Sequence, residues 1–456
     1  MIGLNSSLSI ATEALGAQTA ALEVANNNIA NANTPGYSRQ VVSLSSAASI
    51  QNGTTVDEGV SYQGFTSVRD TVLDMAINAA TSDQGSLTAQ NTLLTQINSA
   101  FSGTTTGIGA SLSTLFSDLS ALSTTPSDSS ARQTVLSDAN ALVDAFQQGA
   151  AALSNASSAA NQQVSSAVAQ VNELSQQIAA LNGQIASAGA NGSDGGALTD
   201  QRDELTTQLA QLLGVSTTQT GGTPTLTTTN GSPLVIGDSS YQLQVTTAAD
   251  GTTHVLDGQG NDITDELTGG TIGGAITARD NTIPALSQQL DALASQFASA
   301  MNNAQAAGYD LNGNPGAAMF TVPATGSAAA GITVALTNGS QIAASSDGST
   351  GSSGNVTTLL AVQSTNLPSA ANPTDSYANL VGNIGFAGSQ ASSGLTATTS
   401  SLQQLTSQQG SESGVSIDEE TSNLIRYQQA YTASARVIST INDMYTVLMN
   451  MSLGES

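Results

Sequence analysis

Apolar residues recur every seven positions along residues 4–29. Two interlocking series carry this repeat: Leu4, Ala11, Gln18 and Ala25, and Leu8, Leu15, Leu22 and Ile29. Their spacings of three and four make the a/d stripe of a coiled coil, so the pattern predicts a helix that packs lengthwise on other helices. Pro35 and Gly36 then prevent the helix from continuing.

The other end of the chain repeats the pattern. One series consists of Ile417, Leu424, Tyr431, Ile438 and Tyr445, and the second contains Tyr427, Ile441 and Leu448. Ser416 followed by Glu419 forms a capping box, which predicts a helix start. Val437, Met444 and Met451 lie beside this stripe.

Two interpretations of these terminal stripes are open. The terminal helices could fold onto the body of the protein, which is the usual fate of an amphipathic helix. Alternatively, they could pair with each other and with helices of neighbouring copies. The C-terminal helix is apolar over a broad arc, and such a helix contacts more than one partner, which favours the second interpretation.

The middle of the chain predicts a long helical rod. No proline occurs between Pro126 and Pro224, and residues 132–190 carry apolar or small residues seven apart. At 1.5 Å per residue, such a helix is on the order of 80 Å long. A rod of this length is unusual in a compact enzyme and natural in a fibrous particle. Shorter helical patterns occur at 73–101, 205–212, 283–301 and 377–405.

Two stretches break the helical period. Residues 215–278 are rich in Thr, Val and Gly and contain three Asn-Gly or Asp-Gly pairs, which predicts short antiparallel strands. Residues 321–360 include the run SSDGSTGSSGN, for which we expect a mobile surface loop. The predicted fold class is therefore mainly α with inserted β, combining terminal coiled-coil-type helices, a long-helix bundle and a small antiparallel β-rich outer domain.

These patterns predict three domains. We expect an inner terminal-helix domain from 1–45 and 410–456, and a long-helix bundle domain from 46–214 and 275–409. Within the bundle, 321–360 is a short β and Gly/Ser-rich excursion. Residues 215–274 form the β-rich outer domain.

Composition excludes several functions. The net charge is −26 and all seven basic residues are Arg, so the surface would repel nucleic acid and anionic lipid headgroups. No apolar run is long enough to span a bilayer. The absence of Cys excludes disulfides and thiolate chemistry. The first residues lack the features of a signal peptide, so secretion would need a route that threads unfolded chains.

Candidate catalytic and metal-binding chemistry is sparse. His254 is the single histidine, no Ser or carboxylate pattern accompanies it, and the chain has no Lys. Asp310, Asn312 and Asn314 match the first ligands of a calcium loop, but Pro315 and Thr321 stand where Gly and Glu are needed. We interpret this segment as a polar turn, with a weak surface calcium site as the alternative. We expect no catalytic, cofactor or metal site.

Two terminal motifs carry a resemblance. The segment ANNNIANANTPGYSRQ, residues 25–40, and the segment SGVSIDEETSNLIRYQQAY, from residue 413, are similar to the signatures of the bacterial flagellar axial family of rod, hook and hook-associated proteins. Interior blocks beginning GGALTDQRDEL and GGAITARDNTI most resemble its hook-associated members. The matching N-terminal motif residues are Asn31, Asn33, Thr34, Pro35, Gly36 and Tyr37.

The resemblance implies a structural adapter that joins hook to filament as a ring of identical subunits. Assembly would use an N-terminal stripe of Leu4, Leu8, Leu15, Leu22 and Ile29, and a C-terminal stripe of Ile417, Leu424, Tyr431, Ile438, Ile441, Tyr445 and Leu448. The implied partners are the hook protein, a second hook–filament junction protein and an export chaperone on the C-terminal helix. The implied location is the extracellular flagellum, after type III export without a signal peptide. No nucleic acid or membrane insertion is implied.

Alternatives remain within and outside this class. A hook or distal-rod subunit shares the terminal signatures, although such relatives are mainly β outside their termini, unlike the rod at 132–190. A wall-cleaving enzyme could also be built on axial termini. The sequence has no convergent acid pair or metal cluster, which weighs against the enzyme.

Overall fold

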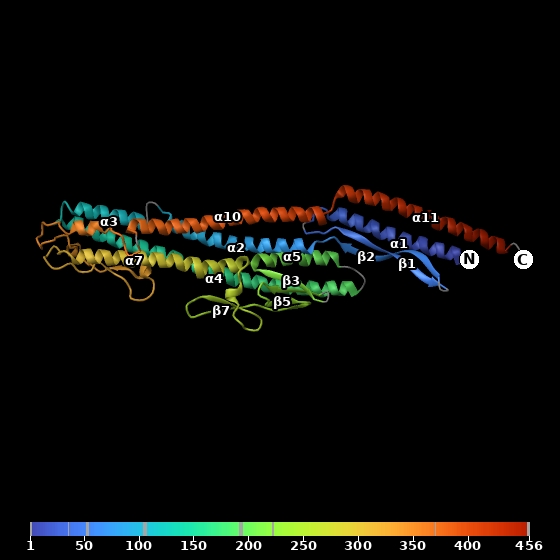
Figure 1. Ribbon diagram of the computed structural model, residues 1–456, viewed down its shortest axis with the longest axis horizontal. Coiled ribbons are helices and arrows are strands. Elements are labelled where there is room, and N and C mark those ends of the chain that lie inside the picture. Colours follow the sequence, from blue (N-terminus) through green and yellow to red (C-terminus); the bar gives the residue numbers. More distant parts are fainter. Residues whose placement is uncertain are drawn as a thin grey trace.

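The computed structural model describes residues 2–34, 36–51, 54–103, 107–190, 195–220, 223–369 and 371–453. Pro35 and the first and last residues of the predicted inner domain lie outside these ranges. The molecule is elongated, with both termini at one end (Figure 1). Its helical share is 67%, which confirms the predicted class of mainly α with inserted antiparallel β.

The terminal helices pack on each other, as their stripes indicate. Helix α1 (Ile2–Asn31) and helix α11 (Ile417–Leu453) run side by side in opposite directions at the end that carries the termini (Figure 1). Tyr445 on α11 donates a hydrogen bond to Asn5 on α1, which fixes their relative height.

A β-hairpin that the sequence patterns did not predict joins this pair. Strands β1 (Gln40–Gln51) and β2 (Thr54–Ser67) are antiparallel and pack on α1. The expected boundary at residue 46 assigned most of this stretch to the helical bundle. A usable signal was the pair Asn52-Gly53, because Asn-Gly is the commonest two-residue hairpin turn. We call α1, β1, β2 and α11 the inner domain.

Long helices form the body of the molecule. Helix α4 (Ser129–Ala190) has 62 residues and is therefore about 90 Å long, as the proline-free rod pattern predicts. Its neighbours are α2 (Thr71–Phe101), α3 (Ile108–Leu122), α5 (Gly196–Leu212), α6 (Gly270–Thr277) and α7 (Ile283–Ala306). Helix α10 (Pro373–Ser413) packs on α2, α3 and α7. A π-helical turn, Ala278–Thr282, joins α6 to α7.

Antiparallel strands project from one side of the body (Figure 1). They form a four-stranded sheet in the order β3-β4-β5-β6 and a separate β7-β8 pair. Their bounds are β3 (Val215–Thr220), β4 (Thr223–Thr228), β5 (Pro233–Ile236), β6 (Ser239–Ser240), β7 (Gln244–Thr247) and β8 (Thr253–Leu256), followed by the 3-10 turn Thr264–Glu266. Buried Leu234 and Val255 join them to α4 through one of two apolar cores.

The second apolar core lies at the far end, where short elements cover α3, α4 and α7. These are β9 (Phe320–Thr321), α8 (Ala328–Gly331), β10 (Thr333–Val334), the 3-10 turn Gly339–Gln341 and α9 (Val356–Ala361). Neither apolar core includes a residue of the inner domain.

The Gly/Ser-rich run has exposed residues between two buried ends, and the mobility that we expected for it stays a prediction. Ser345 and Asn355 at its two ends are buried, with exposures of 1% and 2%. The amide of Asn355 donates to the carbonyls of Ala304 and Ala343 at 2.9 and 2.7 Å, which ties the run to α7. Asp347 accepts hydrogen bonds from two serine hydroxyls within the run. Polar side chains of the run therefore supply hydrogen bonds that composition alone does not reveal.

Candidate assembly site

The N-terminal stripe lies along the inner pair without being fully covered. Its five residues are all half-buried: Leu4, Leu8, Leu15, Leu22 and Ile29. The alanines of α1 lie deeper, with Ala11, Ala17, Ala21 and Ala25 only 1–6% exposed. The deepest contacts of α1 are therefore made by small side chains, and the leucines keep some surface free.

The C-terminal stripe is divided between buried and free positions. Ile441 is buried, and Leu424, Ile438 and Tyr445 are half-buried. Ile417, Tyr431 and Leu448 remain 50%, 40% and 45% exposed. Part of the predicted stripe thus serves the contact between α1 and α11 within one copy.

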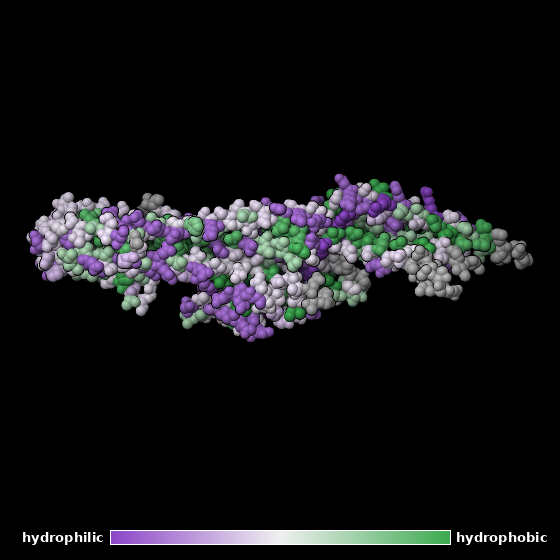
Figure 2. Space-filling model, in the orientation of Figure 1, coloured by the Kyte–Doolittle hydropathy of each residue, from purple (hydrophilic) through white to green (hydrophobic). Residues whose placement is uncertain are grey.

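A further apolar surface on α11 is only partly covered by the described residues of the copy. Val437, Met444 and Val447 are 48%, 49% and 57% exposed, and their spacings of seven and three place them on one side of the helix. We call these three residues the free face of α11. Figure 2 shows apolar atoms gathered over the inner domain toward the two termini. Water is a poor environment for such a surface, which makes it a candidate interaction site.

The N-terminal motif closes a loop between α1 and β1 through a residue that our sequence analysis did not single out. Asn28 is fully buried, its amide donates to the carbonyl of Gln40 at 2.8 Å, and its Oδ1 accepts from the Gln40 amide at 2.9 Å. The hydroxyl of Tyr37 donates to the same oxygen at 2.8 Å. Asn28 was one of several asparagines in the quoted motif, and only its helical position directs it inward.

The predicted motif residues shape the loop that Asn28 closes. Asn31 bonds back to Asn27, and the Thr34 hydroxyl donates to Asn31 at 3.2 Å. Gly36 has a φ of +77°, a left-handed conformation that glycine adopts without strain. Asn33 is exposed. The local role of the motif is therefore to end α1 and turn the chain.

Two arginines hold the inner domain against the body, at a junction that we call the elbow. At the start of α11, the Arg39 guanidinium is ion-paired with the carboxylates of Glu420 and Glu419, with N–O distances of 2.7 and 2.9 Å. Its backbone amide donates to the carbonyl of Ser413, the last residue of α10. Since α10 and α11 are separated by only three residues, Arg39 fixes the point at which the chain re-enters the inner domain.

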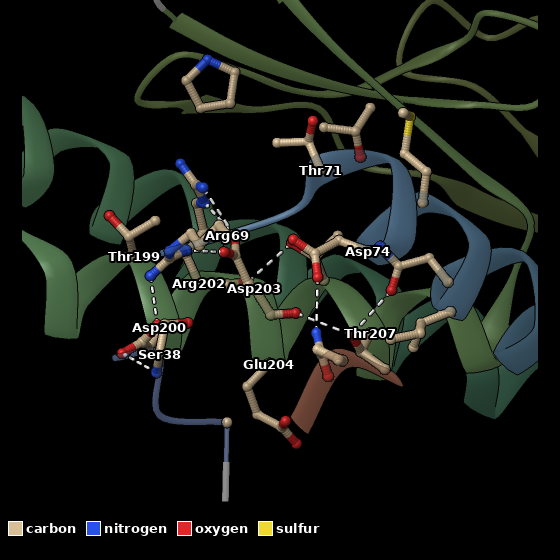
Figure 3. Close-up of a pocket in the computed structure, with 18 of the residues that line it drawn as sticks. Ser38, Arg69, Thr71, Asp74, Thr199, Asp200, Arg202, Asp203, Glu204 and Thr207 are labelled. Atoms are coloured by element: carbon tan, nitrogen blue, oxygen red, sulfur yellow. Dashed lines mark hydrogen bonds and ion pairs between the residues drawn. The ribbon is translucent and has the colours of Figure 1, made fainter. Parts of the chain in front are cut away.

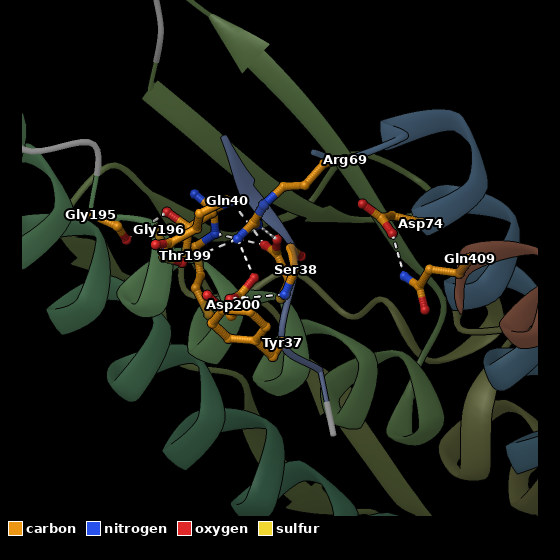
Figure 4. Close-up of polar contacts among 12 residues, drawn as sticks. Tyr37, Ser38, Gln40, Arg69, Asp74, Gly195, Gly196, Thr199, Asp200 and Gln409 are labelled. Atoms are coloured by element: carbon orange, nitrogen blue, oxygen red, sulfur yellow. Dashed lines mark hydrogen bonds and ion pairs between the residues drawn. The ribbon is translucent and has the colours of Figure 1, made fainter. Parts of the chain in front are cut away.

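Arg69, between β2 and α2, forms the second part of the elbow. Its guanidinium is paired with Asp200 and Asp203 on α5, and the backbone amide of Ser38 donates to Asp200 at 3.2 Å (Figures 3 and 4). Burial raises the pKa of Asp200, and the charge of Arg69 opposes that rise. Burial likewise raises the pKa of Asp74, while a hydrogen bond from Gln409 opposes it. The elbow thus depends on paired charges.

A cavity of about 780 Å³ lies among these groups (Figure 3). Its walls come from α2, α4, α5, α10, β3, β4 and the 36–38 segment, and they include Arg69, Asp74, Ile178 and Leu226. Ion pairs and hydrogen bonds therefore surround an open space where the two domains meet, without a continuous apolar core.

In the described parts of the chain, the residues considered for catalysis or metal binding contact other groups of the protein. On the outer β domain, His254 Nδ1 lies 2.7 Å from a carboxylate oxygen of Asp262. The Asp310 carboxylate accepts from the backbone amides of Asn312 and Asn314, both at 2.8 Å, so backbone donors already occupy it. Within the described ranges, no group of three His, Cys, Asp or Glu side chains is placed to hold a metal. No described helix has an apolar stretch long enough to cross a bilayer.

Models of known protein families match three separate segments of the chain. The model of the flagellar hook-associated protein FlgK helical domain matches residues 94–320. A flagella basal body rod protein model matches 8–37, and the C-terminal model of flagellar basal body rod FlgEFG proteins matches 408–451. The last two matches cover the α1 and α11 segments of the inner domain.

Curated relatives match the chain from end to end. Flagellar hook-associated protein 1 of Escherichia coli (strain K12) is 28% identical over 98% of this chain and 100% of its own length. The protein of the same name from Bacillus subtilis (strain 168) is 28% identical over 97% of each chain. The solved structure of the flagellar hook junction protein FlgK from Burkholderia pseudomallei aligns with a TM-score of 0.67 and 22% identity, covering 74% of this chain and 100% of that one, which supports the fold. Over nearly its whole length, the chain is therefore similar to flagellar hook-associated protein 1.

Proposed function

We propose that this protein is a structural subunit at the junction of flagellar hook and filament, where it assembles into a ring through its terminal helices. The observation that carries the proposal is the free face of α11, which is about half exposed in a single copy. The hydrophobic effect favours covering that face with a neighbouring subunit. Similarity supports the place of assembly, because the relatives are flagellar hook-associated proteins.

The elongated body suits the mechanical role. The 62 residues of α4 contribute to both apolar cores, so the body is braced along this helix. The inner domain joins that body at the elbow, where Arg69 and the Ser38 amide contact α5 and the Arg39 amide contacts the end of α10. A braced rod on a polar elbow can transmit torque while the inner domain adjusts its angle. We propose that the body and the inner domain divide these tasks in this way where the bendable hook meets the stiff filament.

The finer assignments belong to the same proposal. The partners are further copies of this chain, the hook protein and a second hook–filament junction protein. An export chaperone covers α11 before secretion, since an exposed apolar face invites premature association. Export proceeds unfolded through the flagellar type III apparatus to the extracellular flagellum. The protein catalyses no reaction. Three domains, namely the inner domain, the long-helix body and the β-rich outer domain, perform these tasks.

A hook or distal-rod subunit is the alternative within the axial family. The long-helix body argues against it, as does the match of residues 94–320 to the hook-associated helical domain. Hooks and rods would still need the terminal helices, so the termini do not separate the two functions.

Electron microscopy of a strain that lacks the protein separates them. We expect complete hooks without filaments, and filaments restored by the full-length chain. Labelled protein should lie at the hook tip of intact flagella. Loss of the hooks themselves would contradict the junction role and favour the alternative. A deletion strain that keeps attached filaments would contradict both.

A further inference from the structure

Most cations of this chain already have partners. Arg39, Arg69, Arg202 and Arg279 are ion-paired with carboxylates, and Arg132 is buried and donates to the carbonyls of Pro126 and Ile342. The remaining two, Arg426 and Arg436, lie exposed on α11. The Arg426 guanidinium donates to Asn423 Oδ1 at 3.0 Å, and its Cζ lies 5.2 Å from the centre of the Tyr427 ring. Among the described residues, neither arginine has a carboxylate within ion-pair distance.

Helix α1 carries the complementary charges. Its only ionisable side chains are Glu13 and Glu23, and both are exposed. Neither forms an ion pair with any described residue. The inner pair therefore presents two unpaired acids on one helix and two unpaired bases on the other, in a chain whose net charge is −26.

The charges match in spacing and in height. Ten residues separate Glu13 from Glu23, and ten separate Arg426 from Arg436, which is about 15 Å on each helix. The Asn5–Tyr445 contact aligns the antiparallel helices. Glu13 lies eight residues after Asn5 on α1. Val437, which is next to Arg436, lies eight residues before Tyr445 on α11. Glu23 lies ten residues further along α1, and Tyr427, which is next to Arg426, lies ten residues further toward the start of α11.

Arg426 lies on the same side of α11 as the free face. It precedes Val437 by eleven residues and Met444 by eighteen, close to three and five whole turns. The surface that needs a partner is thus apolar with an added positive charge. An acidic helix suits it better than another basic or purely apolar one.

We propose that Glu13 and Glu23 of one copy pair with Arg436 and Arg426 of the next copy, and so set the register of neighbouring subunits. The inference rests on the proposed assembly through the terminal helices and names the contact that aligns it. Exposed ion pairs are individually weak, so apolar burial drives the association and the charges select one alignment. A shift of one copy along its neighbour would separate both pairs at once.

Cross-linking tests the register directly, because the natural chain has no Cys. Single-cysteine variants of the full chain, Glu13→Cys and Arg436→Cys, are mixed, assembled on hooks and treated with a short bis-maleimide reagent. We expect covalent dimers of this chain, several-fold more abundant than with the mismatched pair Glu13→Cys and Arg426→Cys. Equal yields from the two mixtures would overturn the register, as would products that join the Arg436→Cys variant only to another flagellar protein.

Charge exchange distinguishes contacts between copies from contacts within one copy. Glu13→Arg/Glu23→Arg and Arg426→Glu/Arg436→Glu should each reduce filament attachment, since each places like charges at every interface. An equal mixture should regain attachment, because alternating copies restore opposite charges between neighbours but not within a copy. Unchanged circular dichroism of the monomers checks that the variants fold.

The outcomes separate this inference from the proposed function. Full attachment by either charge variant alone, or no recovery in the mixture, would overturn the charge pairing while leaving the junction role intact. If the unmodified chain itself fails to restore filaments to the deletion strain, the proposed function fails, and the pairing fails with it.

Discussion

Replacing Val437 and Met444 together by Asp should abolish filament attachment and leave the monomer folded. Both side chains are about half exposed in a single copy, so the change costs the monomer about 0.5 kcal/mol or less per site. In the assembled ring the same positions would bury unpaired carboxylates, at several kcal/mol each in every subunit. Electron microscopy of complemented deletion strains and thermal unfolding of the purified variant measure the two effects.

A matched control exists on the opposite side of the same helix. Ser439 and Thr446 are also seven residues apart and exposed, so Ser439→Asp/Thr446→Asp adds the same charges at the same spacing. This variant should keep attached filaments. Leu424→Asp and Ile438→Asp are a different comparison, because those half-buried side chains lie on the stripe that α1 partly covers. They should weaken the inner pair itself. Normal filaments with Val437→Asp/Met444→Asp would show that the free face stays open to solvent.

Replacing Asn28 by Leu should have the largest effect on the inner domain of the monomer. Asn28 satisfies both backbone polar groups of Gln40, which is only 4% exposed. Each buried group left without a partner costs about 1–3 kcal/mol, so for two groups we expect a loss of roughly 2 to 6 kcal/mol. The expected readouts are faster exchange of the Gln40 amide and faster proteolysis within residues 32–39.

Asn26→Leu is the control for this change. Asn26 lies two residues away on the same helix and is exposed, so its replacement should leave exchange and proteolysis near wild-type rates. The body should be unaffected by either variant, because its two apolar cores contain no inner-domain residue. Equal exchange rates for Gln40 in the two variants would mean that Asn28 does not hold the loop.

The long-period features of the fold could be predicted from the sequence. A seven-residue repeat carries its signal over many turns, so helices at both termini and the rod from 132 to 190 were predictable before any coordinates. The apolar residues Val437 and Met444 were also visible beside the C-terminal stripe. Which of the two apolar sides α1 would cover was not, because both have residues of suitable size and spacing.

Features that depend on a single residue or a short run were harder to predict. The apolar residues of the β1 and β2 hairpin do not keep a two-residue period along the strands, and the hairpin packs on α1. Asn28 is chemically the same as the exposed asparagines beside it. The elbow joins Arg69 to carboxylates more than 130 residues away on α5, a proximity that only the folded chain creates.

Amide hydrogen exchange of α11 in the dilute monomer and in the assembled junction tests the central claim most directly. We expect residues 420–453 to exchange far faster than the core of α4 in the monomer and to become protected on assembly. If α11 in the monomer is already as protected as α4, and assembly changes nothing, then one copy satisfies its own terminal helices and neighbouring copies do not complete the fold.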